Sequence, residues 1–145
     1  MKPEIKLYNR VKNNLENCYI TKLENRGALG VPDLLIGFNN PCKFVMVELK
    51  VVKTGRKVKL SPHQVSFQVR HIKLPVFTIV ETTDKILVYS AKQAIVLVEQ
   101  GIKCDPLFSC DLDNNAQKHR AFLGIYYIRT YILRINRIGT LPHEP

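Results

Sequence analysis

The sequence predicts an α/β domain in which a central mixed sheet of four or five strands is flanked by helices. Short apolar runs rich in valine, isoleucine and leucine alternate with segments whose apolar residues recur at helical spacing. The apolar runs lack regular polar alternation, which is typical of strands buried on both faces. With 145 residues and 46% hydrophobic content, the chain is long enough to form one self-sufficient core.

The first helix is predicted over residues 3–17, where Pro3 suits the first turn. One stripe at helical spacing runs through Glu4, Tyr8, Val11 and Leu15. Glu4 therefore points toward the core, where an acid needs a partner such as a bound cation. The alternative is an N-terminal acid favoured by the helix dipole. Residues 18–23 are predicted to form the first strand.

A β-hairpin is predicted from residues 34–38 and 43–50, joined by a turn that contains Pro41. Centring the turn between Asn40 and Pro41 places Asp33 opposite Glu48, and Leu35 opposite Met46. Glu48 and Lys50 share one face of their strand because side chains alternate. Two carboxylates and one ammonium therefore meet at one end of an apolar hairpin.

This charge cluster has a chemical use. Two neighbouring carboxylates repel each other, and a hard cation such as Mg²⁺ removes the repulsion. A metal, a positioned water and a nearby ammonium are what hydrolysis of a phosphodiester requires. The alternative is an ordinary Glu–Lys pair on a surface hairpin.

Positive charge is concentrated around this hairpin. The formal net charge is +10, and residues 41–75 hold eight Lys or Arg residues against the single acid Glu48. Such clustering indicates a polyanionic partner, most simply nucleic acid, whereas a general role in solubility would not explain it. The glycine-containing loop 51–60 supplies candidate phosphate contacts, unless it is only solvated: Lys53, Arg56, Lys57 and Lys59.

A helix is predicted to begin after Ser61, with Pro62 at its first position and Gln64 closing a capping box. Gln64 has two interpretations of equal weight: a helix cap, or a side chain that hydrogen-bonds the attacking water or the scissile phosphate. The helix is expected to continue to Lys73. Its predicted inward residues are Val65, Val69 and Ile72.

The rest of the chain is predicted as a second hairpin (75–81 and 86–89), a helix over 90–100, a loop over 104–114 and a helical C-terminal stripe. We expect residues 1–102 to form the core and residues 103–145 to form an extension. The extension packs on the core or forms a dimer interface. The stripe runs through Phe122, Ile125, Ile128, Ile132 and Ile135.

The cysteines and the N-terminus bear on cellular location. No signal peptide or membrane span is evident, so a cytoplasmic location with reduced thiols is expected. A zinc site from Cys104, Cys110 and His119 is disfavoured because paired metal-ligand spacing is absent.

Three motifs carry a family resemblance. Gly30-Val31-Pro32-Asp33-Leu34-Leu35, Val47-Glu48-Leu49-Lys50 and Leu60-Ser61-Pro62-His63-Gln64 together resemble the VRR-NUC branch of the PD-(D/E)XK nuclease superfamily. The resemblance covers about residues 3 to 90. It implies a restriction-endonuclease-like core and a Mg²⁺-dependent DNA endonuclease, with Mn²⁺ able to substitute and no small-molecule cofactor.

The resemblance also implies residue roles. Asp33, Glu48 and the Leu49 carbonyl would bind the metal, and Glu4 is the preferred match for a helical acid that completes the cluster, ahead of Glu16 and Glu24. Lys50 would position the water, Gln64 would assist, and Lys22 would contact a phosphate or else be an exposed strand lysine.

The implied substrate is branched DNA such as a Holliday junction, cut by a homodimer. The C-terminal segment 122–138 and the second hairpin are the candidate surfaces for the dimer interface. Two alternatives remain: a site-specific duplex endonuclease of restriction or homing type, and a non-catalytic nucleic-acid-binding module.

Overall fold

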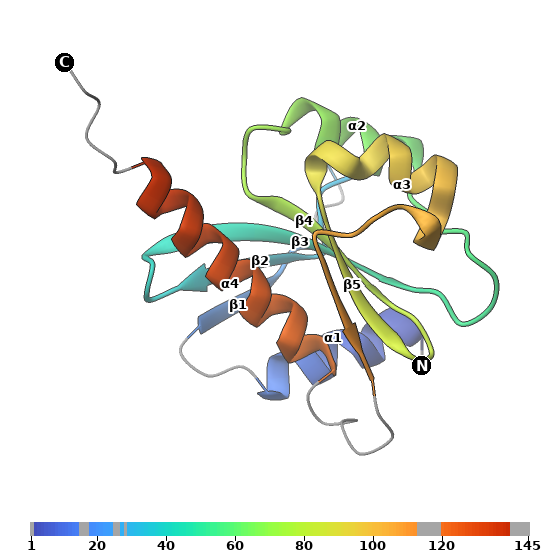
Figure 1. Ribbon diagram of the computed structural model, residues 1–145, viewed down its shortest axis with the longest axis horizontal. Helices are drawn as coiled ribbons and strands as arrows, with labels where there is room; N and C mark the ends of the chain where they lie inside the picture. Colours follow the sequence, from blue (N-terminus) through green and yellow to red (C-terminus); the bar gives the residue numbers. More distant parts are fainter. Residues whose placement is uncertain (1, 15–17, 25–26, 28, 113–119, 140–145) are drawn as a thin grey trace.

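The computed structural model describes residues 2–14, 18–24, 27, 29–112 and 120–139. Within these ranges six strands form one mixed sheet in the order β1-β2-β3-β4-β5-β6 (Figure 1). Only β3 and β4 pair in parallel; the other neighbouring strands are antiparallel. The strands are β1 (Cys18–Lys22), β2 (Leu34–Phe38), β3 (Lys43–Val51), β4 (Val76–Glu81), β5 (Lys85–Ser90) and β6 (Phe108–Asp111).

The register of the first hairpin confirms the sequence prediction. Leu35 pairs with Met46 and Leu34 pairs with Val47, so Asp33 and Glu48 lie at the next opposed position. The sheet has six strands rather than four or five, because the segment predicted as a loop contains β6. This short strand pairs with the edge of β5, where it gains partners for its backbone groups.

Helices α1 (Pro3–Asn14) and α4 (Arg120–Gly139) pack on one face of the sheet. Alternate residues of β2 and β3 fill the core below them, Leu34, Ile36, Val47 and Leu49 among them. The apolar stripe predicted for the C-terminal helix enters this core through Ile125, Ile128 and Ile132, whereas Ile135 is 48% exposed. Phe122 is outside the described side chains.

Helices α2 (Pro62–Arg70) and α3 (Ala94–Gln100) pack on the opposite face (Figure 1). Short 3₁₀ turns flank α3: η1 (Ala91–Gln93) and η2 (Gly101–Lys103). The second core lies between this layer and the sheet and includes Val80, Leu87, Tyr89 and Leu97. Because side chains alternate, Met46, Glu48 and Lys50 project toward this second face.

The inward side of α2 differs from the prediction. Val65 packs on the second core, but Val69 and Ile72 are each 40% exposed, and Gln68 is the buried residue. The helix ends at Arg70 instead of continuing to Lys73, so Ile72 falls outside its periodicity.

The second hairpin, offered above as interface material, lies inside the sheet. β4 pairs with β3 and β5, and β5 pairs with β4 and β6, so the side chains of both strands are largely buried within the domain. All four cysteines are free thiols. In the part of the chain that is described, no helix combines the length and apolar character that crossing a bilayer requires.

Candidate functional site

Asp33 is fixed at the start of β2 by contacts to both neighbouring strands. Its carboxylate Oδ2 accepts a hydrogen bond of 2.9 Å from the Leu49 amide, and its backbone carbonyl accepts one of 2.8 Å from the Leu23 amide. Pro32 precedes it and restricts Val31 to extended conformations. The side chain of Asp33 is therefore held against the middle of β3, next to Glu48.

Glu48 is the buried acid of the site. Its side chain is 2% exposed, and its Oε1 atom accepts a hydrogen bond of 3.0 Å from Gln64 Nε2. Lys50 Nζ lies 3.5 Å from the same oxygen, and the Lys50 side chain is only 17% exposed. An ammonium and an amide thus converge on one carboxyl oxygen of Glu48 at low solvent exposure.

The electrostatics of this pair favour a cation. Burial, and then the negative charge of Asp33, raise the pKa of Glu48 to about 8, although Lys50 acts in the opposite direction. At neutral pH the Glu48 carboxyl therefore holds a proton that an ordinary glutamate has lost. A divalent cation beside the two carboxyls would take the place of that proton, so the residues present fit the donor set that Mg²⁺ prefers.

Gln64 is the helix cap that the sequence offered as one of two interpretations, and it also contacts the acidic pair. Its Oε1 atom accepts a hydrogen bond of 2.9 Å from the Ser61 amide, and its own amide donates to Ser61 Oγ at 3.2 Å. The capping box is complete. Its Nε2 group remains available for Glu48, so the cap aims the amide at the acid.

Gly30 brings the loop of Asp33 directly against the start of α2. It has φ +85°, and a Cβ at this position would collide with the backbone carbonyl of His63. Only glycine accepts both the conformation and the contact without strain. The segments that carry Asp33 and Gln64 therefore also contact each other directly through their backbones.

A second glutamine, Gln68, was not predicted from the sequence. It lies one turn after Gln64, is 1% exposed, and its Nε2 atom donates 2.9 Å to Thr78 Oγ1. Thr78 pairs directly with Glu48 across β3 and β4. The Gln68 Oε1 atom is buried without a hydrogen-bond partner among the described residues. The four-residue spacing of Gln64 and Gln68 was the available signal, because it places both amides on one helix face.

Two predicted residues are not brought into this cluster. Glu4 belongs to α1, which packs on the other face of the sheet. The described ranges contain no group of three or more His, Cys, Asp or Glu side chains placed to hold a metal ion. Lys22 Nζ lies 5.3 Å from the centre of the Tyr8 ring and 3.7 Å from Glu24, which also places it on the α1 side.

The basic loop, residues 52–60, is fixed to the domain at several points. Lys53, Arg56, Lys57 and Lys59 are all exposed, whereas Val52, Val58 and Leu60 are buried in the second core. The Arg56 carbonyl accepts a hydrogen bond of 2.8 Å from the Ile102 amide. The loop therefore presents four cations from a backbone that is held in place.

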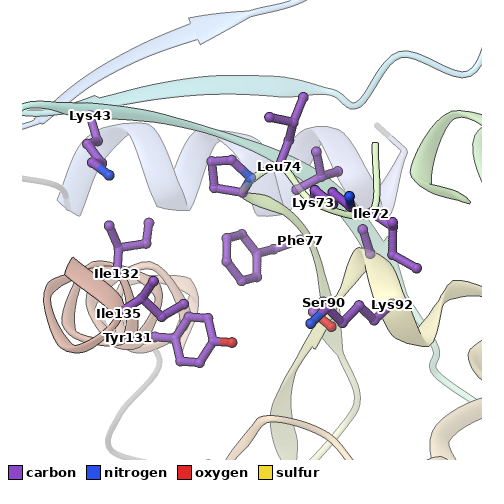
Figure 2. A pocket seen from close by; sticks show the side chains of 13 residues that line it. Lys43, Ile72, Lys73, Leu74, Phe77, Ser90, Lys92, Tyr131, Ile132 and Ile135 are labelled. Carbon is purple, nitrogen blue, oxygen red and sulfur yellow. The ribbon is translucent and has the colours of Figure 1, made fainter. Parts of the chain in front are cut away.

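A pocket of about 420 Å³ lies away from the acidic pair, between α4 and the starts of β3 and β4. Figure 2 shows its lining, which combines apolar side chains such as Phe77, Tyr131 and Ile132 with lysines such as Lys43 and Lys73. None of the residues around Glu48 takes part in it, so the candidate site is the cluster at the end of the hairpin.

No protein-family model and no curated protein matches the chain. A solved structure described as a VRR_NUC domain is 27% identical, and the match covers 68% of this chain and 97% of that chain with a TM-score of 0.46.

Proposed function

We propose that this protein is a metal-dependent endonuclease that hydrolyses phosphodiester bonds of DNA at the Asp33–Glu48 pair. One observation carries the proposal: a buried acid with a raised pKa shares its surroundings with a second acid, an ammonium and an oriented amide. Perturbed titration of a defined cluster is typical of functional sites. A purely structural Glu–Lys pair would not need the Asp33 carboxyl beside it.

The carboxyls of Asp33 and Glu48, with the backbone carbonyl of Leu49, are the proposed ligands of Mg²⁺ or Mn²⁺. The cation, when bound, supplies Lewis acidity to a phosphoryl oxygen and lowers the pKa of a bound water. A contribution from Glu4 would have to pass through a water, because Glu4 is not part of the described cluster.

The remaining residues act on the water and the phosphate. Lys50 stands 3.5 Å from Glu48 Oε1, close enough to orient a water beside that carboxylate and to offset charge that develops on the phosphate. Gln64 restrains the Glu48 carboxyl through its hydrogen bond of 3.0 Å. The cap at Ser61 keeps that amide in place, so the geometry exists before substrate binds.

The basic loop supports nucleic acid as the substrate, because four cationic side chains project from it into solvent: Lys53, Arg56, Lys57 and Lys59. Branched DNA, including the Holliday junction, is the substrate that we place first. A site-specific duplex endonuclease would need base-reading elements, and a non-catalytic module would not need the buried acid pair.

The test is a cleavage assay on linear, nicked, flapped and four-way DNA, with Mg²⁺ or with EDTA. We expect Mg²⁺-dependent cutting by the wild type and none by Glu48→Gln or Asp33→Asn. Both variants should still bind DNA, since the basic residues remain. Glu99→Gln, on the exposed side of α3, is the matched control and should cut normally. Cutting at the wild-type rate by Glu48→Gln would remove this site from the mechanism.

A further inference from the structure

A row of exposed aromatic side chains lies on the same face of the sheet as Glu48. Gly37 in β2 pairs with Tyr19 of β1 on one side and with Phe44 of β3 on the other. Tyr19 is 68% exposed and Phe44 is 65% exposed. Tyr19, Gly37 and Phe44, called here the aromatic row, lie side by side on three neighbouring strands. The rings of Tyr19 and Phe44 are exposed to solvent.

Gly37 determines how the Phe44 ring lies. A Cβ atom at Gly37 would come within 2.9 Å of Phe44 Cε1 and within 3.3 Å of Cδ1. The ring therefore occupies the space that any other side chain at position 37 would fill. It rests on the backbone of β2 and leaves much of its surface exposed, which is the arrangement that stacking of a flat ring requires.

The aromatic row is continuous with the candidate site. Phe44 precedes Glu48 by four residues on the same face of β3, a distance of about 13 Å along a strand. Stacked nucleotides advance by about 3.4 Å each, so this distance corresponds to about four steps of one strand. Between Phe44 and Glu48 on this face lies the cross-strand pair Leu35 and Met46, and both side chains are half-buried.

The chemistry of this path suits a nucleic-acid strand. Between the Asp33–Glu48 pair and the aromatic row, strands β1 to β3 project no acidic side chain on this face. Helices α2 and α3 stand on the same side of the sheet (Figure 1), yet both rings remain mostly exposed. Exposed aromatic rings are the usual platform for bases that lack a pairing partner.

We propose that Tyr19 and Phe44 stack unpaired nucleobases of the substrate strand close to the scissile bond. Among branched DNAs, the protein then prefers those with unpaired nucleotides beside the cut, such as a flap, to a four-way junction whose arms are fully paired. This inference rests on the proposed function, because the DNA strand that is cut at Glu48 is taken to be the strand that passes over Tyr19 and Phe44.

Binding in EDTA tests the inference without cleavage. The probes are a flapped DNA with 2-aminopurine among its unpaired nucleotides near the branch, a single strand, and a fully paired duplex of equal length. Wild-type protein should quench 2-aminopurine fluorescence in the first two probes and not in the duplex. Phe44→Ala should lose the quenching and weaken flap binding about 5- to 100-fold, with duplex affinity unchanged.

Three further variants separate stacking from general apolar contact. Phe44→Trp should preserve the quenching, whereas Phe44→Leu, which keeps an apolar side chain without a ring, should behave like Phe44→Ala. Gly37→Ala retains both rings but displaces that of Phe44, and should weaken quenching. Tyr126→Ala removes an exposed ring on α4 and is the matched control. Circular dichroism confirms that each variant is folded before its binding is compared.

Two results would overturn the inference. The first is equal loss of flap and duplex binding in Phe44→Ala, or full binding by Phe44→Leu. The second is a change in oligomeric state of the DNA-free protein on Phe44→Ala, since the row would then be an interface between copies. Cleavage by the wild type is measured separately, so a true nuclease that lacks a stacking platform is distinguished from a protein without nuclease activity.

Discussion

Binding of Mg²⁺ should release a proton from Glu48. Burial and the charge of Asp33 raise the pKa of this carboxyl to about 8, so at pH 7 it is about nine-tenths protonated. A cation can be bound only by the deprotonated form. We therefore expect release of about 0.9 proton per ion at pH 7 and little release above pH 9.

Isothermal titration calorimetry measures this quantity. Mg²⁺ is titrated into the protein at pH 7 in two buffers of different ionisation enthalpy, and the difference in apparent enthalpy gives the number of protons released. The apparent affinity should rise about tenfold for each pH unit up to about pH 7.5 and then level off as Glu48 ionises. The groups that face Glu48 are Asp33, Lys50 and Gln64.

The Glu48→Gln variant identifies the source of the proton. It should bind Mg²⁺ more weakly and release no proton, whereas Glu99→Gln should match the wild type. Binding at pH 7 with the same apparent enthalpy in both buffers, and so with no measurable proton release from the wild type, would refute the reasoning. Glu48 would then be ionised before the cation arrives.

Four other predictions can be measured independently. Because the pKa of Glu48 is raised on folding, the metal-free fold should lose stability as pH rises from about 4.5 to 8, and Glu48→Gln should raise Tm at pH 8.5 in EDTA. Lys50→Met should lower single-turnover cleavage on the order of 10²-fold with Mg²⁺ affinity retained; an unchanged rate would assign the role to another cation. Replacing Arg56, Lys57 and Lys59 with Ala should flatten the slope of log K against log salt by roughly 2 to 3, and an unmoved slope would mean a solvated loop. Light scattering should show a homodimer, and a monomer that stays monomeric on a four-way junction would exclude a resolvase.

Local patterns predicted the first hairpin well. The turn at Asn40-Pro41 sets the register, and strict alternation then places Glu48 and Lys50 on one face. The capping box was equally readable, because its two partners lie three residues apart. Signals of this kind need only a few neighbouring residues.

Features that depend on residues far apart in the chain could not be predicted from the sequence. β6 is only four residues long and becomes a strand by pairing with β5. The close contact of Gly30 with His63 joins segments more than thirty residues apart. Gln68 is buried because its amide donates a hydrogen bond to Thr78 on the sheet, although the polarity of a glutamine alone favours exposure.

The anchoring of the basic loop has a consequence for selectivity. A mobile cationic arm adapts to any polyanion but loses conformational entropy on binding, whereas this loop is ordered beforehand by Val58, Leu60 and the Arg56–Ile102 hydrogen bond. The Cα atoms that carry its charges therefore hold fixed positions, so binding of a phosphate backbone there costs side-chain entropy but little further ordering of the loop backbone. If the proposed function holds, the loop would favour nucleic-acid shapes whose phosphate backbone passes these positions, without contact to a base.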